Sequence, residues 1–313
     1  MFVLVSALAL AAAPPPVVNG EITRDYPEVV LLYMLDSSGM AAGCTGELIA
    51  PRWVLTASHC VYDTPDFKIK QVYVGWVNNS NEMDNSNSEL AKDWYPNPDY
   101  TGNDEYHDIA LVELRSDHEG PYMPLTDRGL TRKDEGELFR LVGFGITSDN
   151  DTSQISKKRT AEIPLDSYDS RLMYTLDEDT DKNACHGDSG GPFLRQYEDG
   201  TYAVAGIVDF GGDFQTGSCL KGGVYSARVD AYTGFIDGYT TDYTIHTDAP
   251  PEDTGTEDTA VDTGSGAADT GGDTAGETPQ IIPGVCSVAD PRVAGLGLVA
   301  AGLLASGRRR RSA

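Results

Sequence analysis

The chain has 313 residues, with 49 acidic against 23 basic side chains and a formal net charge of -26 at pH 7. This balance argues against nucleic acid as a partner, because phosphate binding needs a basic surface. The excess of negative charge also keeps the chain soluble and repels anionic surfaces.

The N-terminal end has the pattern of an export signal. Residues 1–13 form a short apolar run that ends in three alanines, as signal peptides do, although no Lys or Arg precedes the run. Residues 14–16 are three prolines, which we interpret as a short pro-segment. The sequence therefore predicts an exported protein whose globular part begins at Val17.

Residues 17–240 have the pattern of an all-β domain. Short runs rich in β-branched and aromatic residues alternate with Gly, Pro, Asn and Asp, and no long amphipathic helix interrupts them. The runs most typical of strands are Val29–Tyr33, Trp53–Thr56, Gln71–Gly75, Leu111–Leu114, Phe139–Gly143 and Ala203–Val208. Many short strands at close spacing predict a β-sandwich or a β-barrel.

Three motifs in this domain together have the pattern of acyl-transfer chemistry. His59 lies in TASHC, Asp108 begins DIAL and Ser189 lies in CHGDSGGP. A serine hydroxyl is a weak nucleophile until a base accepts its proton, and His59 is the candidate base. A carboxylate, here Asp108, holds the imidazole in the required tautomer. At these residues, in the order His, Asp, Ser, the chain resembles the trypsin and chymotrypsin family of serine proteases.

The resemblance implies a fold of two packed six-stranded antiparallel β-barrels, with the triad in the cleft between them and a short helix near Val229–Ile236. It also implies that the backbone N–H groups of Gly187 and Ser189 form the oxyanion hole. By the same resemblance, cleavage makes Val17 the new N-terminus, and its ammonium pairs with Asp188. No Lys or Arg precedes Val17 to mark a tryptic activation site.

The cysteines bear on both the fold and the compartment. Four cysteines allow three pairings. The resemblance implies that Cys44 bonds Cys60 around the histidine and that Cys185 bonds Cys219 beside the nucleophile. Paired disulfides indicate export to an oxidising space.

The specificity pocket departs from that of trypsin. By resemblance, Asn183 occupies the base of the pocket, where trypsin-like enzymes have an aspartate, and Gly211 and Gly223 form its walls. A neutral base offers no ion pair to Arg or Lys, and glycine walls leave room for a large side chain. We therefore expect a large neutral or polar residue before the scissile bond.

A second departure is Asp209, which stands where the family usually has a serine in contact with the catalytic aspartate. Two carboxylates close together do not both ionise cheaply. Either Asp209 points elsewhere, or one of the two acids keeps its proton and the triad is retuned.

The remaining chain changes abruptly in composition. Residues 241–283 repeat Asp, Thr and Gly with almost no large apolar residues, which predicts a disordered acidic linker. Residues 284–313 contain Cys286, an apolar run over 293–305 and four arginines at 308–311. Together these features resemble a bacterial C-terminal surface-sorting signal of the myxobacterial type. The alternative is a plain tail anchor with a spare cysteine, although the run is short for a span of about 20 residues.

The sequence thus predicts an exported, surface-anchored serine endopeptidase that hydrolyses peptide bonds through an acyl-enzyme on Ser189. We expect protein or peptide substrates, a monomeric catalytic domain, a membrane contact through the tail, and no cofactor or metal. The alternative is a catalytically inactive protease-fold module that binds a partner on a cell-surface stalk.

Overall fold

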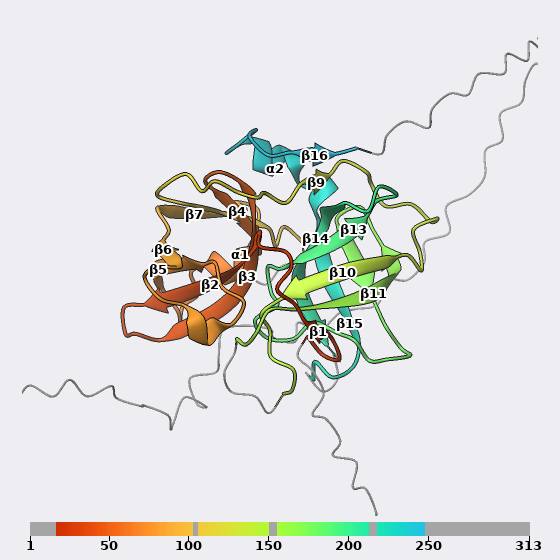
Figure 1. The fold of residues 1–313 in the computed structure, drawn as a ribbon, viewed down its shortest axis with the longest axis horizontal. Coiled ribbons are helices and arrows are strands. Elements are labelled where there is room, and N and C mark those ends of the chain that lie inside the picture. The colour runs from red at the N-terminus through yellow and green to blue at the C-terminus, as the bar shows by residue number, and fades with distance from the viewer. Residues whose placement is uncertain (1–16, 103–105, 150–154, 213–217, 248–313) are drawn as a thin grey trace, which may run out of the picture.

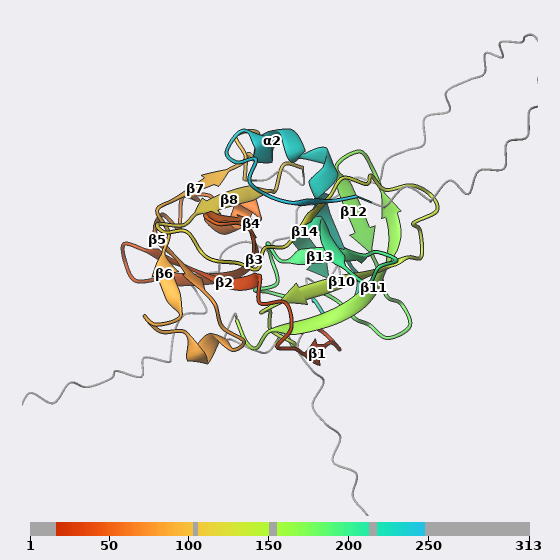
Figure 2. The same ribbon diagram turned by 45° about the horizontal axis from the view of Figure 1, so that its top comes forward.

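The structure is a computed structural model that describes residues 17–102, 106–149, 155–212 and 218–247. The described chain forms two β lobes that lie side by side (Figures 1 and 2). Its longest helix has only 5 residues. No helix in these ranges has the length and apolar character needed to cross a membrane. The all-β prediction is confirmed.

The first lobe is a 7-stranded sheet that curls into a half-barrel and stays open, with strand order β6-β5-β2-β3-β4-β8-β7. All its pairings are antiparallel. Its strands are β2 (Val29–Asp36), β3 (Ala41–Ala50), β4 (Trp53–Thr56), β5 (Ile69–Gly75), β6 (Ser88–Leu90), β7 (Asp93–Pro96) and β8 (Ala110–Glu113).

The second lobe is a closed barrel in the order β13-β10-β11-β12-β15-β14, and an additional pairing of β13 with β14 closes it. The strands are β10 (Leu138–Gly143), β11 (Arg159–Tyr168), β12 (Leu172–Thr175), β13 (Pro192–Gln196), β14 (Tyr202–Gly212) and β15 (Gly223–Arg228). The expected two-barrel arrangement is therefore present as one closed barrel and one open, curled sheet.

Short elements complete the fold. The helices are α1 (Ser58–Val61), η1 (Ser80–Glu82), η2 (Val229–Ala231) and α2 (Thr233–Asp237), the last two in the place predicted for the closing helix. The short strands are β1 (Glu21–Ile22), β9 (Leu125–Thr126) and β16 (Ile245–His246). β16 pairs in parallel with β9, which pairs in parallel with β14, so residues at the start of the predicted linker add to the second lobe's sheet.

Side-chain alternation explains why the strands close around a core. Along β11, Ala161, Ile163 and Leu165 are buried while the residues between them are half-buried, the period of two that a strand facing a core requires. These residues pack with Phe139 of β10 in the core of the second lobe.

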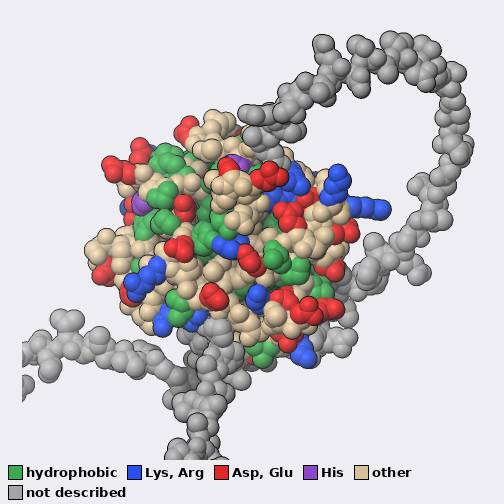
Figure 3. All heavy atoms as spheres, turned by 45° about the vertical axis from the view of Figure 1, so that its right-hand side comes forward, with side chains coloured by type: hydrophobic (Ala, Val, Ile, Leu, Met, Phe, Trp, Pro, Cys, Tyr) green, Lys and Arg blue, Asp and Glu red, His purple; other side chains and the backbone are tan. Residues whose placement is uncertain are grey.

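On the surface, acidic and basic side chains lie among one another over the face in Figure 3, which shows no continuous basic patch there.

The two lobes are bonded to each other at Thr45 of β3, which is fully buried. Its backbone N–H donates to the Ser189 carbonyl oxygen at 2.9 Å, and its hydroxyl donates to the Gly187 carbonyl oxygen at 2.8 Å. The same hydroxyl accepts the N–H of Phe144 at 3.0 Å. One threonine of the first lobe therefore holds two loops of the second.

We expect Thr45→Val, which keeps the shape but loses the hydroxyl bonds, to lower the free energy of unfolding by about 1–3 kcal/mol, because two buried partners lose a bond. Amide exchange at residues 186–191 should also become faster. Thr160→Val is the matched control, since its hydroxyl bonds only the Leu141 carbonyl within the second lobe. Urea unfolding and hydrogen exchange measure both effects, and equal exchange in the two variants would contradict the assignment.

Candidate active site

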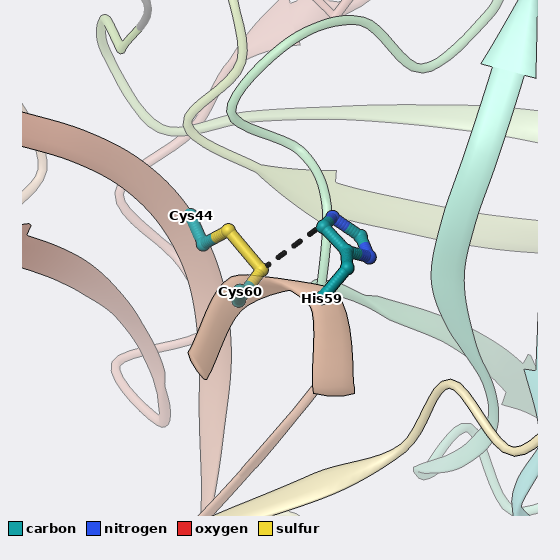
Figure 4. A group of neighbouring side chains, drawn as sticks. All are labelled: Cys44, His59 and Cys60. Carbon is teal, nitrogen blue, oxygen red and sulfur yellow. Dashed lines mark hydrogen bonds between the residues drawn. A yellow bond between two sulfur atoms is a disulfide. The ribbon is translucent and has the colours of Figure 1, made fainter. Parts of the chain in front are cut away.

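The candidate base and its carboxylate are in direct contact. His59 lies on α1, which follows β4, and its Nδ1 is 2.5 Å from Asp108 Oδ2. The backbone N–H of His59 donates to Asp108 Oδ1 at 2.7 Å. Both carboxylate oxygens of Asp108 are thus engaged by one residue, and Nε2 is left as the nitrogen able to accept a proton. Figure 4 shows His59 and Cys60 on α1, with Cys44 on the neighbouring strand.

The backbone around Asp108 is fixed from both sides. The Ser58 hydroxyl donates to the Ile109 carbonyl oxygen at 2.8 Å and accepts the N–H of Asn97 at 3.0 Å. The N–H of His107 donates to the hydroxyl of Tyr232, at 2.8 Å, and His107 has a left-handed φ of 66°. A left-handed backbone in a non-glycine residue has to be held by its surroundings, and here it aims the next side chain, Asp108, at His59.

Burial and charge act in opposite directions on this pair. Burial disfavours the imidazolium, but the charge of Asp108 and its hydrogen bond raise the pKa of His59 above the usual value. Burial likewise disfavours the Asp108 carboxylate, yet the charge of His59, the hydrogen bonds from His59 and a side-chain bond with Asp209 hold the pKa of Asp108 below its usual value. The site therefore favours an ionised Asp108 beside a basic imidazole.

The candidate nucleophile sits on the loop before β13, against the first lobe. Gly190 has a φ of 77°, and a Cβ there would lie 2.1 Å from Thr56 Oγ1, so only glycine fits. The sulfur of Cys60 lies 3.7 Å from both His59 Nε2 and the Ser189 carbonyl oxygen. No hydrogen bond within the described chain joins the Ser189 hydroxyl to His59, and such bonds are often long before substrate binds.

The expected oxyanion donors are available. Within the described ranges, no acceptor is bonded to the N–H of Gly187 or of Ser189, while the neighbouring N–H groups of Asp188, Gly190 and Gly191 are all bonded. A pair of free donors beside a nucleophile is the arrangement that stabilises a developing oxyanion.

Asp188 points into the second lobe, against Gly143 and Gly145, and is fully buried. Its carboxylate accepts the N–H of Gly145 at 2.7 Å and that of Cys185 at 3.0 Å. A Cβ at Gly145 would lie 2.3 Å from Asp188 Oδ2, so the glycine makes the space for the carboxyl group. Burial outweighs these bonds and the charge of Arg159, and raises the pKa of Asp188 to about 7.

Val17 and Val18 are inserted beside this region. Val17 is fully buried and packs with the core of the second lobe. Val18 and Asn183 exchange backbone bonds of 3.0 and 3.3 Å. Val17 has a φ of 37°, an unfavourable value for a β-branched residue. Since φ at Val17 is defined by its bond to residue 16, cleavage of that bond would remove this torsion.

The predicted pocket residues lie together. The Asn183 amide nitrogen donates to the carbonyl oxygens of Lys221 and Gly222 at 3.0 and 3.3 Å, and its oxygen accepts the N–H of Ala184 at 2.9 Å. A Cβ at Gly211 would lie 3.2 Å from the Gly223 carbonyl oxygen and 3.5 Å from Asn183 Oδ1. Asn183 is therefore held by backbone groups around its whole amide.

The two disulfides form as the sequence implies, between Cys44 and Cys60 and between Cys185 and Cys219. The bonded sulfurs are not available as metal-binding thiolates. His59, Asp108 and Asp209 also gather, with candidate ligand atoms within 4.8 Å of one another. Because the imidazole Nδ1 is already bonded to Asp108, we assign no metal to this group.

Sequence reasoning named the three candidate groups but missed the residues that hold the backbone around them. Thr45, Ser58 and Tyr232 act through hydroxyl bonds to backbone groups far away in the chain. Of these three residues, only Ser58 has a position in the sequence that points to the site, because it directly precedes His59. Nothing in the sequence around Thr45 or Tyr232 marks them, because their partners are brought near only by folding.

Comparison with known proteins adds to this geometry. The family model described as Trypsin matches residues 18–236. The chain is 31% identical over 262 residues to Melanization protease 1 of Drosophila melanogaster, covering 71% of this chain and 64% of that protein. It is 28% identical over 244 residues to Serine protease Hayan of the same species, covering 68% and 37%. It is 28% identical over 225 residues to Coagulation factor XII of Sus scrofa, covering 63% and 36%. The chain thus spans 36% to 64% of the length of these relatives.

The raised pKa of Asp188 predicts how the stability of the chain uncut at Val17 depends on pH. Folding favours the protonated carboxyl, so its contribution is complete below the usual value of 3.8 and is lost as the pH rises through about 7. Between pH 4 and pH 8, the free energy of unfolding should fall by up to about 4 kcal/mol more than in Asp188→Asn.

Urea unfolding of both proteins, purified with residues 14–16 still attached and in a Ser189→Ala background that prevents self-cleavage, measures the difference. The same comparison on chains that begin at Val17 is the control, because the free ammonium should stabilise the carboxylate and remove the fall. Parallel pH profiles in the uncut pair would contradict the environment described for Asp188.

Proposed function

The chain belongs to the trypsin family of serine proteases, and on that premise we propose that it is a serine endopeptidase acting on protein or peptide substrates. The observation that carries the proposal is the contact of 2.5 Å between His59 Nδ1 and Asp108 Oδ2, beside the loop that presents Ser189. That contact is the part of a triad that keeps the histidine in its working tautomer.

In the proposed reaction, His59 Nε2 takes the proton of Ser189 as the hydroxyl oxygen attacks the scissile carbonyl carbon. The carbonyl oxygen becomes negative and accepts the N–H groups of Gly187 and Ser189. His59 then returns the proton to the leaving amine, which departs and leaves an acyl-enzyme on Ser189. A water molecule, deprotonated by the same histidine, releases the acid product and restores the serine.

Activation is proposed to follow cleavage before Val17. The strained φ of Val17 and the buried Asp188 without a salt bridge in the described chain support this, since a new ammonium would balance a carboxylate that burial otherwise keeps protonated. We propose Val17 and Asp188 as the activation pair, with residues 14–16 as the segment removed.

For specificity, we propose a large neutral or polar side chain in the pocket formed by Asn183, Gly211 and Gly223. The Asn183 amide is occupied by backbone groups and carries no charge, which supports a neutral pocket base. An aspartate there would provide a charge partner for Arg or Lys.

For location, we propose an exported protease held at the cell surface. The signal peptide of residues 1–13, the linker beyond residue 247 and the segment 284–313 lie outside the described residues, so this proposal depends on their sequence and on the two disulfides. Positive residues stay on the cytoplasmic side of a membrane, so the four arginines at 308–311 would lie inside and the protease domain outside.

Removal of the nucleophile tests the activity. Ser189→Ala should lower peptide hydrolysis by about 10⁴- to 10⁶-fold and abolish labelling by a fluorophosphonate probe, because nucleophile and base act as a unit. Ser170→Ala, an exposed serine on the same lobe, is the matched control and should label normally. A parent protein that begins at Val17 and does not label would favour the alternative, a protease-fold module that only binds its partner.

Truncation tests the location. The full chain should sediment with membranes, while a chain that ends at Glu277 should be found in the soluble exported fraction, since it lacks the apolar run and the arginines. Cys286→Ser in the full chain separates the two anchoring routes: loss of membrane attachment indicates a modified cysteine, and retention indicates the apolar run. Identical fractionation of the full and truncated chains would refute surface attachment.

A further inference from the structure

Asp209 lies at a β-bulge that turns its side chain toward the triad. β14 and β15 pair with Val208 opposite Ser226 and Phe210 opposite Tyr225, so Asp209 is the extra residue between two consecutive pairs. Bulges redirect side chains and are frequent beside active sites. The strand is also fixed here, because Val208 and the loop residues Gly190 and Gly191 exchange backbone bonds of 2.7 and 2.9 Å.

The sequence leaves open whether Asp209 points away from the triad, and the bulge decides this. Asp209 Oδ1 lies 4.0 Å from His59 Nδ1, on the same nitrogen that Asp108 contacts. The side chain is only 9% exposed, and one of its carboxylate oxygens lies within 4.8 Å of the carboxylate of Asp108 and the imidazole of His59. Asp209 therefore points at the triad and shares its buried space.

The surroundings of Asp108 favour its ionised form and disfavour a second negative charge at Asp209. Asp108 accepts both the Nδ1–H and the backbone N–H of His59, and both bonds favour its ionised form. A second carboxylate beside it would add a like charge in a buried site. The carboxyl group of Asp188, on the adjacent loop, faces Gly143 and Gly145 instead, and β15 presents Ser226 and Tyr225 opposite the bulge.

We propose that Asp209 is a positioning residue of the triad that keeps its proton and donates it in a hydrogen bond to the Asp108 carboxylate. The proposal deepens the proposed protease function and rests on it. The bond would hold the Asp108 carboxylate in place beside His59 Nδ1. With the proton in place, the imidazolium formed during turnover faces one net negative charge.

The shared proton also sets the basicity of His59. If Asp209 were ionised, the imidazole Nδ1 would face two carboxylates, and the second negative charge would raise the pKa of His59 further. A protonated imidazole accepts no proton from Ser189, so the triad would be idle. The proton on Asp209 thus keeps His59 usable as a base.

The test compares Asp209→Asn, which keeps a donor but carries no charge, with Asp209→Ala, which has no donor. In full chains on a Ser189→Ala background, ¹⁵N NMR follows the ring nitrogens of His59 through a pH titration, with His59→Gln for assignment and Asp127→Asn as an exposed matched control. We expect Asp209→Asn to leave the His59 titration within about half a pH unit of the parent. A fall of about one unit or more would show that a negative charge had been removed and would overturn the proposal.

Kinetic measurements on chains that retain Ser189 test the positioning role of Asp209. Asp209→Ala should lower kcat by about 10- to 100-fold with little change in KM, the effect of losing a hydrogen bond to a charged group, and Asp209→Asn should recover most of the loss. Equal kcat values for the two variants would overturn the positioning role. If no form hydrolyses peptides while the NMR result holds, the protease assignment fails and the shared proton stands.

Discussion

The proposed chemistry of this protein depends on holding two separate lobes in fixed relation. His59 and Asp108 belong to the first lobe, and Ser189 belongs to the second, so an error of about 1 Å between the lobes would separate the proposed base from the proposed nucleophile. Thr45 opposes that error directly, because its backbone and hydroxyl bond the carbonyl groups of Ser189 and Gly187. The disulfide between Cys44 and Cys60 lies beside it and ties β3 to the helix that carries the histidine.

Three buried carboxyl groups surround this junction, and each is accommodated differently. Asp108 is ionised and paired with His59. Within the part of the chain that the structure describes, Asp188 accepts hydrogen bonds from two backbone N–H groups, and burial raises its pKa. Asp209 shares the space of Asp108 and keeps a proton in our proposal. Because a lone buried charge is costly, the local partners decide the protonation state of each acid.

Much of the fold, and the contact between His59 and Asp108, could be predicted from sequence for identifiable reasons. Strands with continuous apolar runs, such as Val29–Asp36, are evident, and the three motifs around His59, Asp108 and Ser189 are contiguous in the chain. β3 was not predicted, because AAGCTGELIA consists mostly of small residues and has only Thr45 and Ile49 as β-branched residues. β11 was not predicted because it contains Pro164. The direction of Asp209 depends on a one-residue bulge, which pairing across the sheet creates and local pattern does not encode.

The parallel contact of β16 with β9 has a mechanical consequence for a tethered domain. The chain leaves the described fold just after Ile245–His246, whose partners are Leu125 and Thr126. The buried Leu125 is in turn paired with Val204 of β14, the strand that carries Asp209. If the domain is tethered as we propose, tension transmitted to residue 247 would load this short ladder first, and its two residue pairs would separate before the barrel does. The ladder would then break before the load reached β14, the strand that carries Asp209.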